Sequence, residues 1–373
     1  MFSIILSAFL MLSVFSSGIF INDAVADVKI YNVSGKLTEI KDDFLNIFID
    51  KNEPEKEKRE VTEPLPQVYV GGYPIGLKLY ADGVVIVGTE AVDTKNGFVN
   101  TAEKAGLKLG DIIKKVNETQ VKSNSQVSSI IEKSAGEELI FEVERQGKCF
   151  EVTFKAEFSV SEQKYKAGIW IRDSSAGIGT VTFCTKEGCF ASLGHAVCDI
   201  DTKSSIPISQ GECTRAKLTG FVKGQNGSAG ELYGYLENKR TGIIFSNDSL
   251  GVYGAFDTLP ENQQLYEIAS ASEVVTGEAE IITTIENGIT ETYSIIIEKV
   301  DVRSTENKNL VIRITDRNLI EKTGGIIQGM SGSPIIQNGK IVGAVTHVFL
   351  NDATGGFGIF AETMLFKLEK NKQ

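Results

Sequence analysis

The stretch QGMSGSPIIQNGKIVGAVTH, residues 328–347, constrains the fold more than any other part of the sequence. Asn338 and Gly339 form a two-residue hairpin signal between two apolar runs. We therefore predict a tight, glycine-flanked loop around Ser331 that leads directly into a β-hairpin. Small neighbours expose a serine oxygen, and an unusual backbone path can aim amides at a developing oxyanion. Ser331 is accordingly a candidate nucleophile, with the amides of Gly329 and Ser331 as a candidate oxyanion hole.

The Gly-x-Ser-x-Gly elbow of α/β hydrolases does not describe this loop. Ser333 stands where the second glycine is required, and no helix follows. The loop resembles instead the nucleophile loop of chymotrypsin-like peptidases, which also precedes a β-hairpin. Ser333 is a minor alternative nucleophile, and a plain turn without catalysis would also account for the glycines.

A serine nucleophile needs a base, and the sequence has two histidines, His195 and His347. In the chymotrypsin-like order the base lies well upstream of the nucleophile, on the first barrel. His195 fits that position relative to Ser331. His347 follows the predicted hairpin, where it fits the wall of a substrate pocket or a strand histidine with satisfied hydrogen bonds. We therefore predict His195 as the base.

The C-terminal block, residues 164–373, is rich in glycine and in short β-type runs. Amphipathic helices are scarce in it before residues 361–370. This pattern favours a β-barrel or sandwich over an α/β hydrolase. We expect a mainly β fold in which residues 164–373 form a chymotrypsin-like double β-barrel peptidase domain.

A second domain is expected at residues 66–157, before the peptidase. Residues 102–113, AEKAGLKLGDII, combine a helix that ends at Gly106 with a turn into a strand. Residues 123–134 place apolar side chains at helical spacing. The block resembles a PDZ domain (α+β), in which a peptide adds a strand to a sheet edge and backbone amides capture its C-terminal carboxylate. The alternative is a PDZ fold that serves only for packing or tethering. The resemblance implies that the carboxylate-binding loop is formed by Ile75, Gly76 and Leu77.

The N-terminal region predicts export. Residues 2–21 carry no charge, are long enough to span a bilayer core, and precede the small residues 24–26. We expect residues 1–26 to form an apolar helix, either a cleaved signal peptide or a retained membrane anchor. Residues 27–65 are expected to be a linker, because they include the charged, Pro-containing run 51–60.

Composition excludes two classes of partner. The chain has 38 Lys and Arg against 49 Asp and Glu, a formal net charge of −11. Affinity for nucleic acid rests mostly on cationic contacts to phosphates, so nucleic acid is not expected as a partner. Two histidines are too few for a His-rich metal site, and we expect neither a metal nor a cofactor.

The five cysteines leave three alternatives open. Cys184 and Cys189 flank a plausible four-residue hairpin loop, and an exported chain permits a disulfide there. A zinc site is a second alternative, and reduced, buried thiols are the third. The cysteines are Cys149, Cys184, Cys189, Cys198 and Cys213.

The C-terminal block resembles one family in several segments, the stage IV sporulation protein B peptidases of endospore-forming bacteria. The segments are LGHAVCDIDT at 193–202, KGQNGSAGE at 223–231, TGGIIQGMSGSP at 323–334 and GAVTHVF at 343–349. The resemblance extends over about residues 66–368.

This resemblance implies a serine endopeptidase in the space between the forespore and mother-cell membranes, secreted or anchored by its N-terminal segment. Its protein substrates would be itself and then a regulatory membrane protein, the regulator of an intramembrane metalloprotease. That cleavage would activate the late mother-cell sigma factor. The PDZ domain would bind peptide C-termini and control self-cleavage and substrate engagement.

The resemblance also implies Asp316 as the acid of a catalytic triad. In a chymotrypsin-like layout the acid comes from the first barrel, so the spacing favours Asp248 instead. Asp199 and Asp201 are near His195 in sequence. Two further functions stay open, a non-catalytic PDZ signalling module and a general exported quality-control protease.

Overall fold

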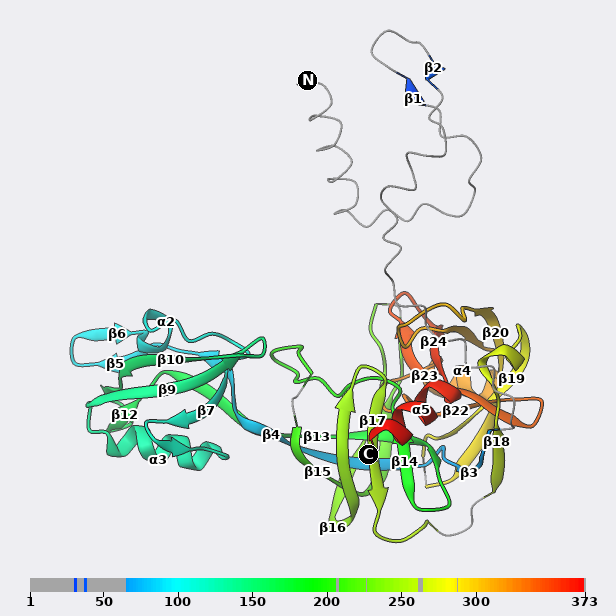
Figure 1. The fold of residues 1–373 in the computed structure, drawn as a ribbon, viewed down its shortest axis with the longest axis horizontal. Coiled ribbons are helices and arrows are strands. Elements are labelled where there is room, and N and C mark those ends of the chain that lie inside the picture. The colour runs from blue at the N-terminus through cyan, green and yellow to red at the C-terminus, as the bar shows by residue number, and fades with distance from the viewer. Residues whose placement is uncertain are drawn as a thin grey trace. The chain divides into compact units, whose positions relative to one another are not determined.

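The computed structural model describes residues 65–205, 208–225, 227–260, 264–286 and 288–371 and two short strands, β1 (Ile30–Tyr31) and β2 (Leu37–Thr38) (Figure 1). Apart from β1 and β2, all described residues lie in one unit of the chain, Val61–Gln373. The predicted N-terminal helix at 1–26 lies outside the described residues, as does nearly all of the linker at 27–65. No helix within the described residues is both long enough and apolar enough to cross a membrane.

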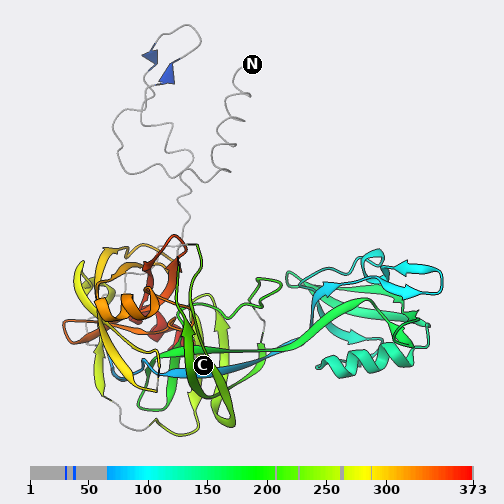
Figure 2. The same cartoon turned by 180° about the vertical axis from the view of Figure 1, so that it is seen from behind.

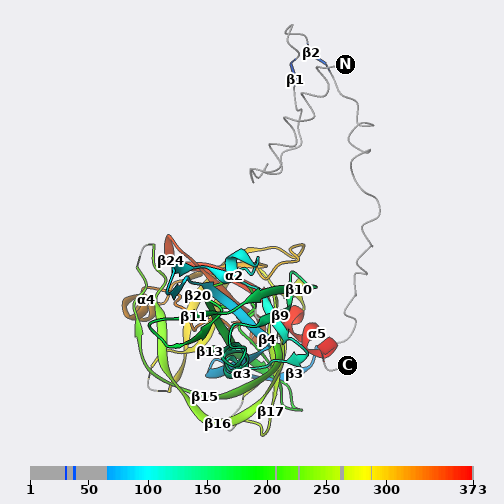
Figure 3. The ribbon, with the colours of Figure 1, turned by 90° about the vertical axis from the view of Figure 1, so that its left-hand side faces the viewer.

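Six antiparallel strands close into a first barrel. Its neighbours follow the ring β4–β13–β14–β17–β16–β15 and back to β4. The interior is apolar and includes Leu79, Phe190 and Val252, all fully buried. Figure 3 shows β15, β16 and β17 side by side. The strands are β4 (Pro74–Thr89), β13 (Ile169–Cys184), β14 (Cys189–Ser192), β15 (Ile208–Val222), β16 (Glu231–Asp248) and β17 (Gly251–Phe256).

A second antiparallel barrel follows in the sequence. Its ring is β19–β20–β21–β24–β23–β22 and back to β19. Along β20 every second residue from Tyr293 to Ile297 is buried, the alternation of a strand with one face in a core. The strands are β19 (Gly277–Thr284), β20 (Thr290–Val300), β21 (Leu310–Ile314), β22 (Pro334–Gln337), β23 (Lys340–Phe349) and β24 (Asp352–Phe360).

The two barrels share one topology. In each, the six strands in chain order close as first, second, third, sixth, fifth and fourth. The hairpin predicted at Asn338 and Gly339 is confirmed, because both residues have positive φ, 52° and 75°, and join β22 to β23. The mainly β fold is confirmed, and the strand pairings form the expected double barrel.

Smaller elements pack the barrels together (Figures 1 and 2). β3 pairs with β13 and β18, and β18 pairs in parallel with β23. Helix α5 follows β24 directly and buries Met364, Leu365 and Leu368 in a cluster that also contains Phe183 and Ile341. These elements are β3 (Gln67–Val70), β18 (Leu265–Ile268), the 3-10 helix η2 (Ala271–Glu273) and α5 (Ala361–Asn371).

A smaller lobe with its own core is inserted between the first two strands of the first barrel. Its apolar cluster extends from Val84 to Ala167 and includes Phe141 and Phe154, whose rings meet edge to face. Its elements are β5 (Val92–Thr94), β6 (Gly97–Val99), α2 (Thr101–Lys104), β7 (Ile112–Val116), β8 (Thr119–Gln120), α3 (Asn124–Lys133), β9 (Glu138–Arg145), β10 (Lys148–Lys155), β11 (Glu157–Ser159) and β12 (Lys164–Lys166).

Local sequence explains the lobe's helices. The Ser123 side chain caps α3 by accepting from the amide of Gln126, and Val127 and Ile131 are buried at helical spacing, as predicted. Gly106 has φ +87° just after α2, the left-handed conformation expected at a helix end. Asp111 is fully buried and ion-paired with Arg145, Nε to Oδ1 at 2.6 Å, which anchors the turn into β7.

The predicted domain boundaries are wrong in one respect. Residues 67–81 belong to the peptidase sheets, because β3 and the first half of β4 pair with β13, β15 and β18. The second half of β4 and the start of β13 pair with each other inside the lobe, for example Ile86 with Ile171. The lobe therefore does not precede the peptidase domain but interrupts its first barrel.

The expected carboxylate-binding loop is also wrong. Gly76 lies near the start of β4, within the strand, and is paired with Ile178 on one side and Thr214 on the other. Ile75 and Leu77 are each 2% exposed and form part of the first barrel's core. A strand paired along both edges has no free amides to offer a carboxylate.

Candidate active site

The two predicted catalytic residues lie on equivalent connections of the two barrels. His195 follows β14, on the connection from the third to the fourth strand of the first barrel. Ser331 follows β21 and the short helix α4 (Arg317–Thr323), on the connection from the third to the fourth strand of the second barrel. Equal topology thus places both residues on corresponding loops.

The Ser331 loop packs directly against the first barrel. A Cβ on Gly332 would lie 2.1 Å from the carbonyl oxygen of Thr180 and 2.5 Å from the amide nitrogen of Leu193, and φ of Gly332 is +96°. The Thr180 hydroxyl donates to the carbonyl of Gly329 at 2.7 Å. Glycine at 332 is therefore required both for the backbone conformation and for contact with the segment that leads to His195.

Two amides of this loop take no part in the hydrogen bonds that hold it. The amides of Met330, Gly332 and Ser333 donate to the carbonyls of Ile327, Val345 and Met330, respectively. The amides of Gly329 and Ser331 have no hydrogen-bond partner among the described residues. These are the two amides that the sequence predicts as an oxyanion hole, and unpaired donors beside a nucleophile are what that role requires.

The two serines of the loop differ in accessibility. Ser331 is half-buried, and its Oγ donates to the carbonyl of Thr346 on β23 at 2.8 Å. Ser333 is fully buried, with its Oγ 2.6 Å from the carbonyl oxygen of Met330 and 2.9 Å from Oγ1 of Thr283. Burial and these contacts make Ser333 a structural residue and leave Ser331 as the candidate nucleophile.

The ring of His195 is oriented by a backbone carbonyl. Nδ1 lies 2.8 Å from the carbonyl oxygen of Ala196. Because a carbonyl can only accept, Nδ1 carries the proton and Nε2 holds the lone pair that a general base uses. Burial lowers the pKa of His195, against the opposing effect of the Ala196 carbonyl, so the ring stays neutral further into acid.

The second histidine is a neighbour of the first. The ring centroids of His195 and His347 are 5.1 Å apart, at an interplanar angle of 40°. Partial burial lowers the pKa of His347, and the nearby charges of His195 and Lys308 lower it further. His347 is exposed near the end of β23, and its place on the wall of a substrate pocket stays a prediction.

Side chains outside the His195 loop fix its path. The side-chain amide of Asn247 accepts from the amide of Val197 at 2.7 Å and donates to its carbonyl at 3.0 Å. Arg172 at the start of β13 forms ion pairs with Asp199 and Asp201, the latter at 2.7 Å. The carboxylate of Asp199 is thus engaged by Arg172 and by the amides of its own turn rather than by His195.

The two candidate acids, Asp316 and Asp248, have their hydrogen bonds and ion pairs with groups other than His195. The Asp316 carboxylate caps helix α4, accepting from the amide of Leu319 at 3.1 Å. Asp248 pairs with Lys367 of α5 at 3.1 Å. Among the described residues, no carboxylate is hydrogen-bonded or ion-paired to His195. Asp316 as the acid therefore stays a prediction of the resemblance.

The cysteines form no disulfide in the described part of the chain. Cys184 pairs across the hairpin with Phe190 and belongs to the first barrel's core, whereas Cys189 packs beside the cluster under α5. The two thiols therefore belong to different apolar clusters. No group of three or more potential metal ligands occurs within the described residues.

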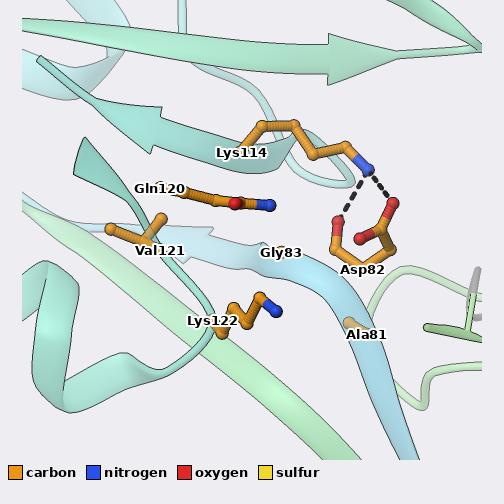
Figure 4. A pocket seen from close by; sticks show the side chains of 7 residues that line it. All are labelled: Ala81, Asp82, Gly83, Lys114, Gln120, Val121 and Lys122. Carbon is orange, nitrogen blue, oxygen red and sulfur yellow. Dashed lines mark hydrogen bonds and ion pairs between the residues drawn. The ribbon is translucent and has the colours of Figure 1, made fainter. Parts of the chain in front are cut away.

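A small pocket in the smaller lobe is shown in Figure 4. It is lined by residues of β4 near Gly83 and by Gln120 and Lys122. Lys114, which also lines the pocket, donates to the backbone carbonyl of Asp82 at 2.6 Å and to the Asp82 carboxylate at 2.8 Å. The lining of this pocket includes neither Ser331 nor His195, which lie on loops of the two barrels.

The family model described as SpoIVB peptidase S55 matches residues 163–365. The chain belongs to the SpoIVB peptidase family. It is therefore a serine peptidase, and the matched region holds His195, Asp316 and Ser331.

No curated protein matches the chain. Among solved structures, the Rv3671c protease from M. tuberculosis in its active form is 18% identical, with a TM-score of 0.33, over 52% of this chain and 74% of that one. The HtrA-type protease AlgW with a decapeptide is 13% identical, with a TM-score of 0.33, over 54% of each chain. Scores this low do not establish the fold, which rests on the strand pairing of the two barrels.

Proposed function

We propose that this serine peptidase acts in sporulation signalling, where it cleaves itself and then a regulator of an intramembrane metalloprotease. Cleavage of that regulator would activate the late mother-cell sigma factor. Membership of the SpoIVB peptidase family supports this role. One structural observation carries the catalytic part: the loop of Ser331 packs on the loop of His195 while the amides of Gly329 and Ser331 lack partners among the described residues.

The chemistry follows from these groups. Ser331 Oγ leaves the carbonyl of Thr346, attacks the carbonyl carbon of the scissile peptide bond and gives its proton to Nε2 of His195. The amides of Gly329 and Ser331 stabilise the resulting oxyanion. The imidazolium then protonates the leaving amine as the C–N bond breaks. Water hydrolyses the acyl-enzyme, with His195 again accepting and returning a proton.

The test of the catalytic pair is substitution in the full chain. Ser331→Ala and His195→Ala should each abolish self-cleavage, and Ser331→Ala should abolish labelling by a fluorophosphonate probe. Losses of about 10⁴-fold or more are typical for such residues. Ser333→Ala is the matched control, because it removes a hydroxyl from the same loop and should lower stability by about 1 to 3 kcal/mol while labelling persists. Self-cleavage retained by purified Ser331→Ala would refute the assignment.

The role of Asp316 can be separated from its capping role. Asparagine caps helices about as well as aspartate, so Asp316→Asn should preserve α4 and the melting temperature. If Asp316 is the triad acid, Asp316→Asn should lower kcat by about 10⁴-fold. If Asp316 serves only as the cap of α4, probe labelling of Asp316→Asn should equal that of the wild type. Asp248→Asn is the parallel variant for the rival acid, whose pairing with Lys367 it weakens.

We propose the smaller lobe as a PDZ-type module that binds peptide C-termini. Ala167-Gly168-Ile169 repeats the apolar-Gly-apolar pattern, and Gly168 has φ +66°. Within the described residues, Ile169–Arg172 pairs only with β4 and leaves its other edge open to a peptide strand. Calorimetry with a peptide and its C-terminally amidated form tests this, because a carboxylate-binding loop requires the free carboxylate.

The location proposed for the enzyme is the space between the forespore and mother-cell membranes. The uncharged N-terminal segment supports export. Mass spectrometry of the mature N-terminus distinguishes a retained membrane anchor from a cleaved signal peptide. Turnover of unfolded casein by the purified enzyme would favour a general quality-control protease over a signalling role.

A further inference from the structure

Asn307 lies on a loop of the second barrel that is braced by its own hydrogen bonds. Asp301 Oδ1 accepts from the amides of Arg303 and Ser304 at 3.0 and 3.1 Å. The side chain of Asn309, which is 3% exposed, donates to the carbonyl of Ser304 at 3.0 Å. Asn307 is therefore presented from a fixed support between β20 and β21.

The side chain of Asn307 reaches across to the first barrel. Its Nδ2 donates to the carbonyl of Gly194 at 2.9 Å and to the carbonyl of Ser249 at 3.0 Å. Gly194 directly precedes His195, and Ser249 lies in the turn between β16 and β17. Both hydrogens of the amide group are used, so one side chain joins two loops of the first barrel.

The backbone of Asn307 is tied to the strand beside the nucleophile. Thr346 Oγ1 donates to the carbonyl of Asn307 at 3.0 Å, and the carbonyl of Thr346 accepts from Ser331 Oγ at 2.8 Å. Gly194 also touches this strand, because a Cβ on it would lie 2.7 Å from Cγ2 of Thr346. Asn307 thus stands between the segments that hold the base and the nucleophile.

We propose that Asn307 is a positioning residue, which holds the loop of His195 against the second barrel so that its imidazole is aligned with Ser331. The inference rests on the proposed roles of His195 and Ser331. Asn307 touches neither reacting atom. It acts through Gly194 and Thr346, one residue from the base and one hydrogen bond from the nucleophile.

The expected size of the effect follows from geometry. The base and the nucleophile belong to different barrels, so their separation depends on contacts between the barrels. A misplacement of about 1 Å between reacting groups can cost about 10²-fold in rate. Loss of Asn307 should act in this way, while the loop that carries it keeps its bonds through Asp301 and Asn309.

The test measures how fast a fluorophosphonate probe labels Ser331 in the purified full chain, since this reaction needs the base but no identified substrate. Asn307→Ala removes both donors. Asn307→Asp keeps the volume but places an oxygen against two carbonyls. Each variant should slow labelling at saturating probe by about 10²-fold, with little change in the probe concentration at half-maximal rate. Glu306→Ala, an exposed neighbour on the same loop, is the control and should label normally.

The pH dependence of labelling distinguishes positioning from folding. In Asn307→Ala, the released loop lets water reach His195, so the acid limb of the labelling rate should move to higher pH. His347 and Lys308, the titratable groups near His195, are retained in every variant, and Glu306→Ala removes only the exposed ion pair of Glu306 with Lys308 at 3.7 Å.

Equal labelling rates for Asn307→Ala and Glu306→Ala would overturn the inference. A loss explained by a lower folded fraction, with the acid limb unmoved, would overturn it as well. Normal labelling of His195→Ala would overturn the proposed function itself. Loss of labelling in His195→Ala with normal labelling in Asn307→Ala would refute only the positioning role.

Discussion

The two barrels have the same strand order, but their third-to-fourth connections are stabilised differently. In the second barrel, the loop of Ser331 is held by its own turns and by hydroxyls of β13, such as Thr180 to the carbonyl of Gly329. In the first barrel, the loop of His195 is held by side chains from other segments, with Asn247, Asn307 and Arg172 as its supports.

This difference indicates how the site can be controlled. A nucleophile loop that is held by its own turns and by the adjoining strand β13 keeps the oxyanion amides preorganised, as electrostatic catalysis requires. A base loop that depends on distant segments responds to changes in those segments. Arg172 is one of them, because it lies on β13 where the strand leaves the smaller lobe, next to Asp173, which accepts from the first amide of α3 at 2.9 Å.

Gly332→Ala should have the largest effect, because it forces the two loops apart. The new Cβ would lie 2.1 Å from the carbonyl oxygen of Thr180, and φ is +96°. We expect probe labelling to fall by more than about 10²-fold. Gly339→Ala is the matched control, with φ +75° and no atom within 4 Å of the Cβ, and should cost about 1 kcal/mol of stability without loss of labelling. Comparable losses in both variants would show that strain alone, and not the contact between loops, is responsible.

Thr180→Val should have an intermediate effect. It removes the donor to the carbonyl of Gly329 and keeps the shape of the side chain. The loss of one hydrogen bond should cost about 1 kcal/mol and slow labelling by about 10-fold, because the adjoining oxyanion amide is less well placed. Thermal unfolding and labelling rates measure the two effects. An unchanged labelling rate would mean that the loop braces itself without the first barrel.

Arg172→Ala should affect stability more than catalysis. Asp199 is 4% exposed and would lose the donor Arg172, which is itself partly exposed, at a cost of about 1 to 3 kcal/mol at neutral pH, with only a few-fold slower labelling. Burial opposes the charge of Asp199, but the amide of Thr202 and Arg172 outweigh it, so the pKa of Asp199 is lowered.

The pH dependence of that cost has a definite sign. A lowered folded-state pKa contributes stability above the unfolded value, about 3.9, and that stability is lost as the pH falls through the folded value. The difference between wild type and Arg172→Ala should therefore be largest near neutral pH and shrink below about pH 4. A difference that is constant from pH 7 to pH 3, measured by denaturant unfolding, would contradict the role of this ion pair.

Local sequence predicted those parts of the molecule that depend on neighbours in the chain. Asn338 and Gly339 encode their own turn, and residues 123–134 encode an amphipathic helix with its cap. Ser331 was recognisable because a nucleophile loop needs small residues at adjacent positions. The placement of Ile75–Leu77 was not predictable, because an apolar segment reads the same whether its strand pairs inside a barrel or borders a peptide groove.

The supports of the base were missed for a similar reason. Asn247, at the end of β16, and Asn307, in a loop, belong to no motif in the sequence, and their partners, Val197 and Gly194, are distant in the chain. A glycine beside His195 was the one local signal, since Gly194 leaves no room for a side chain against Thr346. Such a signal indicates that another segment packs closely against this glycine, but it does not identify that segment.

The sequence by itself determined that this chain has a serine set in a glycine-rich loop, a histidine available as its base and a family motif that joins them. Each of those features is formed by residues that are close together in the chain, so it can be recognised from the sequence. Only the tertiary structure decided that the smaller lobe interrupts the first barrel, that equal strand orders place His195 and Ser331 on corresponding loops, and that Asn307 links them. The physical reason is that strand pairing and contacts between barrels join residues far apart in the chain, and such contacts leave no periodic pattern in the sequence.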